Sequence, residues 1–152
     1  MEPLKLLVVE DDENDYHLIE MALKEGRFPT RVRWVRDGVE AMDYLTGLAP
    51  FQDRQEHPSP DLVLLDLKMP RMGGFELLRW LRDSRAHRTL PALVMSSSPL
   101  TDDIRRAYDL GATSYFVKPH RFEEFVELFK HLAAYWNFAA SPSRPASAQA
   151  FA

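Results

Sequence analysis

Residues 62–70 read Leu-Val-Leu-Leu-Asp-Leu-Lys-Met-Pro, and this stretch decides the fold class. Four consecutive apolar residues, Leu62 to Leu65, have the length of a short strand that is buried on both faces. Such strands are typical of parallel sheets that are covered by helices on both sides. Asp66 follows the last apolar residue directly, so we expect a carboxylate at the end of this strand.

Similar apolar runs recur on either side of this stretch, each set off by polar residues, Gly or Pro. We expect strands at Leu6 to Val9, Val32 to Val35, Leu62 to Leu65, Ala92 to Met95 and Tyr115 to Val117. The expected helices are a segment carrying Leu18 to Leu23 with Asn14 as its cap, Gly38 to Leu45, Phe75 to Leu81, a segment capped by Thr101 that ends before Gly111, and Phe122 to Trp136. Five βα units in a row predict an α/β fold, a doubly wound five-stranded parallel sheet with helices on both faces.

Two segments depart from this alternation. Residues 46–60 have mixed charge and no apolar period, which predicts a long loop that is either functional or merely tolerated. Residues 139–152 are rich in Ala, Ser and Pro, a composition that cannot bury enough apolar surface to become ordered. We therefore expect one folded domain over residues 1–138 and a flexible tail over 139–152.

Composition excludes several classes of function. The chain has 152 residues, enough for one domain with one sizeable core. Its net charge of -4 gives no reason to expect a nucleic-acid partner, because binding to a phosphate backbone needs clustered Lys and Arg. The absence of cysteine excludes disulfides, thiolate metal sites and thiol nucleophiles, and fits a reducing compartment. No apolar run approaches the ~20 residues of a membrane span, so we expect a cytoplasmic protein without membrane contact.

The residues that follow the apolar runs carry groups that suit one site. In open α/β sheets, ligands bind beyond the carboxyl ends of the strands. These positions hold Glu10, Asp11 and Asp12 after the first run, Asp66 after the third, Ser96 to Ser98 after the fourth, and Lys118 with Pro119 after the fifth. Carboxylates that meet at a common edge repel one another, and a hard divalent cation such as Mg²⁺ relieves that repulsion.

This set of groups suits phosphoryl transfer. A carboxylate beside a metal ion can attack phosphorus and form an aspartyl phosphate. The charge on the transferred group is then neutralised by the metal, by the Lys118 ammonium and by the Ser96 hydroxyl. Taken singly, each residue also has an ordinary explanation, since acidic residues after a strand often cap a helix and Lys-Pro often marks a turn.

Four motifs in order resemble the receiver domains of response regulators, over about residues 4 to 137. They are Val-Val-Glu10-Asp11-Asp12, Leu-Leu-Asp66-Leu-Lys-Met-Pro70, Val-Met-Ser96-Ser97 and Gly111-Ala112-Thr-Ser-Tyr115-Phe-Val-Lys118-Pro119. The resemblance implies a flavodoxin-like (βα)5 fold and a phosphoacceptor in a two-component signalling system. Such a protein takes its phosphoryl group from a sensor histidine kinase and catalyses only its own phosphorylation and dephosphorylation.

The resemblance also implies a metal site. By it, Asp66 is the phosphoacceptor, and Asp11, Asp66 and the backbone carbonyl of Lys68 are direct ligands of Mg²⁺. Glu10 holds the metal through a water molecule.

Further roles follow for the fourth and fifth strands. By the same resemblance, Lys118 binds the phosphoryl group, Ser96 is the switch hydroxyl, and Tyr115 is the aromatic residue that moves with it. The peptide bond between Lys118 and Pro119 is expected to be cis, which X-Pro bonds adopt more readily than others. The alternative for Tyr115 is a plain core tyrosine, and only motion separates the two.

A second resemblance is to response regulators that serve phytochrome-type histidine kinases. It is carried by the long loop before the third strand and by the ending Ala133-Ala-Tyr-Trp136-Asn. It implies a light-sensing kinase as phosphodonor and a tendency to form homodimers. The fourth helix, fifth strand and fifth helix are the expected output surface, but the downstream partner stays open. Lys68 and Ser97 lie at positions that tune hydrolysis, so the lifetime of the phosphoaspartate is open as well.

Two alternatives compete with this interpretation. A haloacid-dehalogenase-like phosphatase needs a second aspartate two residues after the first as general acid, and Lys68 stands there. A pseudo-receiver, which binds partners without taking phosphate, tends to lack the phosphorylation residues, and all of them are present here. Four arginines spaced by three are interpreted as a solvated helix face: Arg79, Arg82, Arg85 and Arg88.

Overall fold

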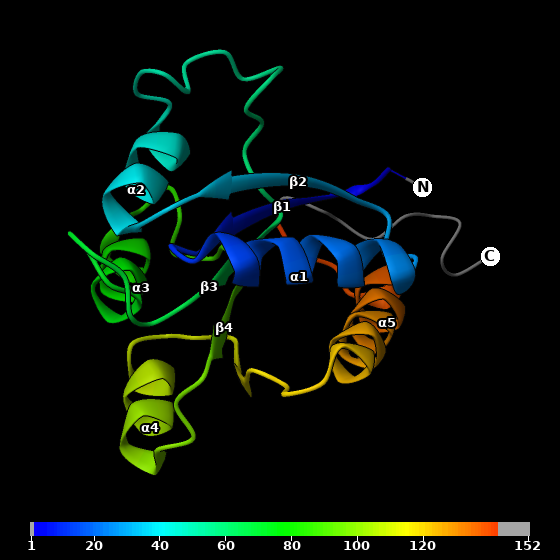
Figure 1. Ribbon diagram of the computed structural model, residues 1–152. Coiled ribbons are helices and arrows are strands. Elements are labelled where there is room, and N and C mark those ends of the chain that lie inside the picture. The colour runs from blue at the N-terminus through cyan, green and yellow to red at the C-terminus, as the bar shows by residue number, and fades with distance from the viewer. Residues whose placement is uncertain (1, 143–152) are drawn as a thin grey trace.

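A computed structural model describes residues 2–142 and shows five strands alternating with five helices (Figure 1). The strands are β1 (Leu4–Val9), β2 (Thr30–Val35), β3 (Leu62–Leu65), β4 (Ala92–Ser96) and β5 (Ser114–Val117). The helices are α1 (Glu13–Glu25), α2 (Gly38–Thr46), α3 (Gly74–Asp83), α4 (Thr101–Asp109) and α5 (Phe122–Phe138). Each predicted element is present, with its ends shifted by a few residues.

The five strands form one parallel sheet in the order β2-β1-β3-β4-β5. The predicted fold class is therefore confirmed. The central strands β1, β3 and β4 are almost wholly buried, as their apolar runs predict. The prediction of burial on both faces was wrong for β2 and β5, which are partly exposed because they lie at the two edges of the sheet.

Two layers of helices cover the sheet (Figure 1). Each layer packs on its own apolar core. Alternate residues of each strand point to opposite faces, so Leu7 and Val9 of β1 pack against α2, α3 and α4, while Leu6 and Val8 pack against α1 and α5. The stripe predicted on α5 supplies Phe125, Phe129 and Trp136 to the second core. Burial on both faces fixes the register, and this fixes which residues reach the carboxyl edge.

Two predicted helix caps were wrong. Asp12, and not Asn14, caps α1, because its side chain accepts hydrogen bonds from the backbone N–H groups of Asn14 and Asp15. Thr101 is the first residue of α4 and not its cap; the cap position is Leu100. The hydroxyl of Ser98, in the preceding loop, accepts the N–H of Leu100 and so binds a backbone donor at the start of α4.

The arginines late in α3 do not all face solvent, contrary to the prediction. Arg82 donates four hydrogen bonds to backbone carbonyls: two to Gly111 at 2.9 and 2.7 Å, one to Leu90 at 2.8 Å and one to Arg88 at 3.2 Å. Gly111 has a φ of 97°, and a side chain there would collide with Arg82. Arg82 thus ties α3 to the loops that lead into β4 and β5. Arg79, Arg85 and Arg88 are exposed as predicted.

The long loop between α2 and β3 packs against the edge of the sheet at β2. Its carbonyls at Gln55 and Glu56 accept hydrogen bonds from Arg31 and Arg33 of β2. Phe51 is buried against Tyr44 and the core beneath α2. The loop is therefore part of the folded domain.

The predicted tail, residues 139–152, lies outside the described residues except for 139–142. Within the described part of the chain, no helix has the length and apolar character needed to cross a bilayer.

Candidate functional site

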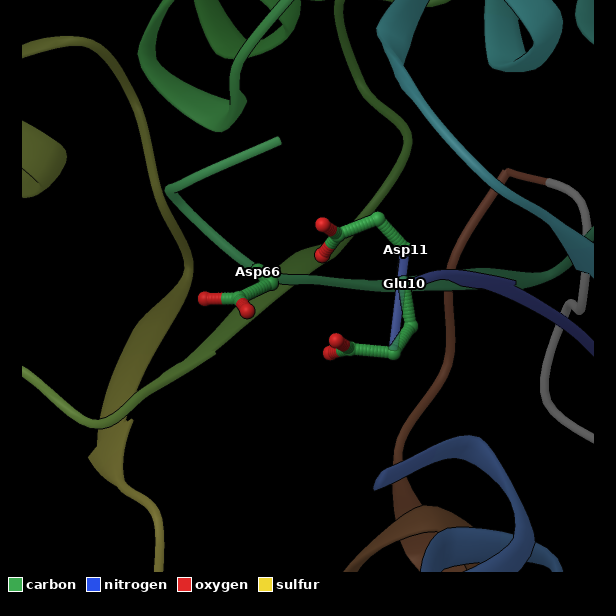
Figure 2. A group of neighbouring side chains, drawn as sticks. All are labelled: Glu10, Asp11 and Asp66. Atoms are coloured by element: carbon green, nitrogen blue, oxygen red, sulfur yellow. The ribbon is translucent and has the colours of Figure 1, made fainter. Parts of the chain in front are cut away.

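Three carboxylates from two strands meet at the carboxyl edge of the sheet (Figure 2). Glu10 and Asp11 follow β1, and Asp66 follows β3; each offers an oxygen, and these three oxygens lie within 4.8 Å of one another. β1 and β3 are neighbours in register, with Val9 opposite Leu65, so the residues after them are brought together. The structure thus places Glu10, Asp11 and Asp66 as the strand-end rule predicts.

The turn after Asp66 is held close by a glycine. Gly74, the first residue of α3, donates its N–H to the Leu67 carbonyl at 2.9 Å. A Cβ atom at position 74 would collide with the backbone of Asp66 and Leu67. The Asp66 side chain accepts the N–H of Leu67 at 2.7 Å, and this bond orients one of its two oxygens. Only a residue without a side chain lets α3 begin so near the acidic cluster.

Glu10 is the most deeply buried of the three carboxylates, with 2% of its surface exposed. Burial raises the pKa of Glu10 to about 7, and the neighbouring charge of Asp66 acts in the same direction. Attraction to Lys118 and the hydrogen bond from the Asp12 N–H oppose this rise without cancelling it. A cation bound beside Glu10 would stabilise its ionised form and so lower this raised pKa.

Lys118 supplies the positive charge of the site. Its Nζ lies 3.1 Å from Asp66 Oδ2, 3.2 Å from Glu10 Oε2 and 2.6 Å from Asp15 Oδ2, and its side chain is 12% exposed. Burial alone would lower the pKa of Lys118, but the hydrogen bond to Asp15 and the charges of Asp66 and Glu10 outweigh it and raise that pKa. The lysine is therefore a fixed cation beside the predicted phosphoacceptor.

Ser96 ends β4 at the same edge and is 2% exposed. Its hydroxyl accepts the N–H of Ser98 at 3.2 Å, and its carbonyl accepts the N–H of Lys118 at 2.7 Å. Tyr115 is half-buried and donates its hydroxyl to the Ser98 carbonyl at 2.8 Å. The predicted switch pair is thus joined through the β4–α4 loop, while its motion stays a prediction.

The predicted cis bond between Lys118 and Pro119 was wrong, because the bond is trans in the structure. The trans form is the lower in free energy for X-Pro bonds by about 0.5–1 kcal/mol, and Lys118 reaches the carboxylates with it. The cis bond among the described residues is Ala49–Pro50. Lys68 has an exposed side chain, and the role of its carbonyl as a metal ligand stays a prediction.

Two features of the site were missed from the sequence. Asp15, in the first turn of α1, makes the shortest of the three Lys118 contacts. The available signal was its place at the start of the helix that directly follows Glu10 and Asp11, because that helix start lies beside the carboxyl end of β1. Trp34 donates its indole N–H to the Glu10 carbonyl at 2.7 Å and stacks on Tyr16 at 4.2 Å. Nothing in the sequence ties that tryptophan to the acidic residues.

The donor set fits a small hard cation. The cluster offers carboxylate oxygens alone, and Mg²⁺ prefers oxygen ligands, binding through one or two carboxylates and several waters. One ammonium group faces Glu10, Asp15 and Asp66, so the described site holds more negative than positive charge. A divalent cation would offset this excess.

A five-stranded parallel sheet with an acidic cluster, a partly buried lysine and a buried serine at its carboxyl edge defines the receiver class of signalling domain. The family model for the response regulator receiver domain matches residues 6–130, and the chain belongs to this family.

Three similar proteins illustrate the relationship. The probable methanogenesis regulatory protein FilR2 of Methanothrix harundinacea is 35% identical over 135 residues, which cover 89% of this chain and 84% of FilR2. The crystal structure of response regulator RPA3017, in red light signaling of R. palustris, is 35% identical with a TM-score of 0.86, covering 92% of this chain and 98% of that one. The phosphorylated cyanobacterial phytochrome response regulator RcpA is 33% identical with a TM-score of 0.83, covering 92% and 99%.

Proposed function

We propose that this protein is a phosphoacceptor response regulator that takes a phosphoryl group onto Asp66 with Mg²⁺. The observation that carries the proposal is the convergence of Glu10, Asp11 and Asp66 beside the partly buried ammonium of Lys118. Membership of the receiver family supports the same assignment. RcpA, which resembles this chain closely, was crystallised in a phosphorylated form.

Each residue of the site has a separate role in the proposed phosphoryl transfer. A carboxylate oxygen of Asp66 forms the new bond to phosphorus as the bond from phosphorus to the donor's leaving atom breaks, and the electron pair of the broken bond goes to the donor. Lys118 directs an N–H to an oxygen of the transferred group, and the Ser96 hydroxyl can donate to another. Bound Mg²⁺ would be held by Asp11 and Asp66, with Glu10 behind them, and would neutralise charge on the phosphoryl oxygens.

The phosphodonor we propose is a sensor histidine kinase of the phytochrome type. The names of RPA3017 and RcpA associate those proteins with red light and phytochrome, and both cover nearly the whole of this chain. FilR2 is named for methanogenesis, so similarity at this level is shared by receivers with other inputs. The tendency to form homodimers stays a prediction.

We further propose that the protein catalyses only its own phosphorylation and dephosphorylation. A phosphatase of the haloacid-dehalogenase type needs a general acid two residues after the nucleophile, and Lys68 stands there with its side chain exposed. Lys68 replaces that acid, so the position that would protonate the leaving group of an external ester holds no carboxylic acid. Turnover of external phosphate esters is therefore not expected.

The test is intact mass spectrometry after incubation with a small phosphodonor and Mg²⁺. We expect the mass of one phosphoryl group to be added to the parent protein and none to Asp66→Asn, while chelation of the metal prevents the addition. An unchanged mass in the parent, or equal labelling of the variant, would instead support a binding module that takes no phosphate. Replacing the small donor by a phosphorylated phytochrome-type kinase, and by one without a light sensor, tests the choice of partner.

A further inference from the structure

Asp15 makes the shortest of the contacts to Lys118, although it lies outside the acidic cluster. Its Oδ2 is 2.6 Å from Lys118 Nζ, compared with 3.1 Å for Asp66 and 3.2 Å for Glu10. Asp15 stands in the first turn of α1, where the side chain of Asp12 accepts its backbone N–H. The side chain of Asp15 is thus presented to Lys118 from a capped, well-defined helix start.

An ammonium group has three N–H donors, and here three carboxylates accept them. Two of these acceptors, Glu10 and Asp66, also belong to the cluster that can hold a cation. A divalent cation in that cluster would compete with Lys118 for their oxygens and would repel its positive charge. Asp15 is the acceptor that the cation would leave free.

We propose that Asp15 is a positioning residue, which holds the Lys118 ammonium beside Asp66 so that one N–H faces the incoming phosphoryl oxygen. This inference rests on the proposed function, because it assigns a task to Asp15 in the same reaction. With Asp15 as its anchor, Lys118 keeps its place when the cation draws on Glu10 and Asp66. The N–H that now bonds Asp66 is then the one nearest to the transferred group.

The size of the effect follows from what Asp15 does and does not touch. Its side chain is 37% exposed, so the ion pair by itself contributes modestly to stability. A small displacement of a catalytic donor costs far more in rate, since phosphoryl transfer depends on positioning. We expect Asp15→Asn to slow phosphorylation of Asp66 about 10-fold, with Mg²⁺ saturating for each variant.

The matched control is Glu13→Gln. Glu13 lies in the same helical turn, is 64% exposed and pairs with His17, so the substitution removes the same charge without touching Lys118. We expect Glu13→Gln to be phosphorylated at the parental rate and Asp15→Glu, which keeps the carboxylate, to recover part of the rate lost in Asp15→Asn. Mg²⁺ saturation can be checked by intrinsic fluorescence, to which Trp34, bonded to the Glu10 carbonyl, contributes together with Trp80 and Trp136. Equal slowing in Glu13→Gln and Asp15→Asn would overturn the proposal in favour of a general charge effect.

A second measurement does not depend on phosphorylation. Urea midpoints are compared for Asp15→Asn, Lys118→Met and the double variant, all without metal. We expect the double variant to lose less than the sum of the two single losses, because each single change removes the same ion pair between Asp15 and Lys118. Strict additivity would overturn the inference even if the parent is phosphorylated. Failure of the parent to take phosphate, with coupling still present, would instead count against the proposed function.

Discussion

Two cations are drawn out of solvent at opposite ends of the sheet, and they meet different partners. Lys118, at the carboxyl edge, faces three carboxylates. Arg82, near the entries to β4 and β5, donates its hydrogen bonds within the described chain to backbone carbonyls, those of Gly111, Leu90 and Arg88. Lys118 balances the negative charge of carboxylates that can also bind a ligand. Arg82 donates hydrogen bonds to neutral carbonyls that would otherwise lose these donors.

The partners decide what each cation can do. Carboxylates raise the pKa of Lys118 despite its burial, whereas burial lowers the pKa of Arg82, which has no acidic group within hydrogen-bonding distance among the described residues. Carboxylates that pair with a lysine can exchange that contact for one with a metal ion when the ion binds. The backbone carbonyls that bind Arg82 cannot exchange partners in this way, because the fold holds them in place. We therefore assign Lys118 to function and Arg82 to stability.

The largest expected effect is on function, in Lys118→Ala. Removing one fixed donor from a phosphoryl-transfer site slows the reaction by about 10²–10³-fold. The rate is measured as the appearance of phosphorylated protein by intact mass with a small phosphodonor at saturating Mg²⁺. A variant that reacts within a few-fold of the parent would show that the lysine is structural, as Arg82 is, and would remove the contrast.

The next effect is on stability, in Arg82→Ala. The substitution removes all four hydrogen bonds from Arg82, two of them to Gly111, and we expect a loss of about 2–4 kcal/mol in the free energy of unfolding. Urea denaturation measures it. Arg79→Ala is the control, since Arg79 is exposed one turn earlier in α3, and it should change stability by less than about 0.5 kcal/mol. Folded Arg82→Ala should still be phosphorylated at nearly the parental rate.

The third expected effect is a dependence of stability on pH without metal. The pKa of Glu10 is raised to about 7 in the folded protein, against 4.5 as its ordinary value, so between these pH values the folded state holds a proton that the unfolded chain has released. Stability therefore falls as pH rises from about 5 to 8, by roughly 1–3 kcal/mol. Urea midpoints with a chelator measure this loss.

Two controls isolate the contribution of Glu10. Glu10→Gln should flatten the loss of stability between pH 5 and 8, because the amide does not titrate. Mg²⁺ should offset the loss at pH 8, since its positive charge stabilises the ionised Glu10 carboxylate. A parent protein whose stability rises over this range would contradict the assignment.

The contrast between the two cations also shows what the sequence could predict. Strands and strand-end chemistry follow from local patterns, so Glu10, Asp66, Ser96 and Lys118 could be placed at one edge before the structure was known. Arg82 was taken for a surface residue, because its partners lie 8 and 29 residues away and are backbone atoms that carry no sequence signal.

Asp15 illustrates an intermediate case. Its position on the first turn of α1 could have been inferred from the helix start, but its contact crosses 103 residues to reach Lys118. The sequence predicted Asn14 as the cap of α1, whereas the structure has Asp12 there. The helix therefore begins two residues earlier, and Asp15 lies in its first turn. Local pattern thus gives the neighbourhood of a residue, and long-range packing decides its partner.

The smallest expected effect concerns the long loop, in Arg54→Ala. Like Arg82, Arg54 serves carbonyls, donating to Tyr44 at 2.7 Å and to Phe51 at 3.2 Å. It is partly exposed, so we expect a loss of about 1 kcal/mol and faster hydrogen exchange over residues 47–61.

Gln52→Ala is the control for Arg54→Ala, because Gln52 is exposed in the same loop. Neither change should alter the phosphorylation of Asp66 by a small donor, since the loop packs on β2 through Arg31 and Arg33. The hydrogen bonds described for the Asp66 and Lys118 side chains come from other segments. A slower reaction in Arg54→Ala alone would mean that the loop acts on the site. The distinction between cations that bind carbonyls and cations that bind carboxylates would then no longer separate stability from function.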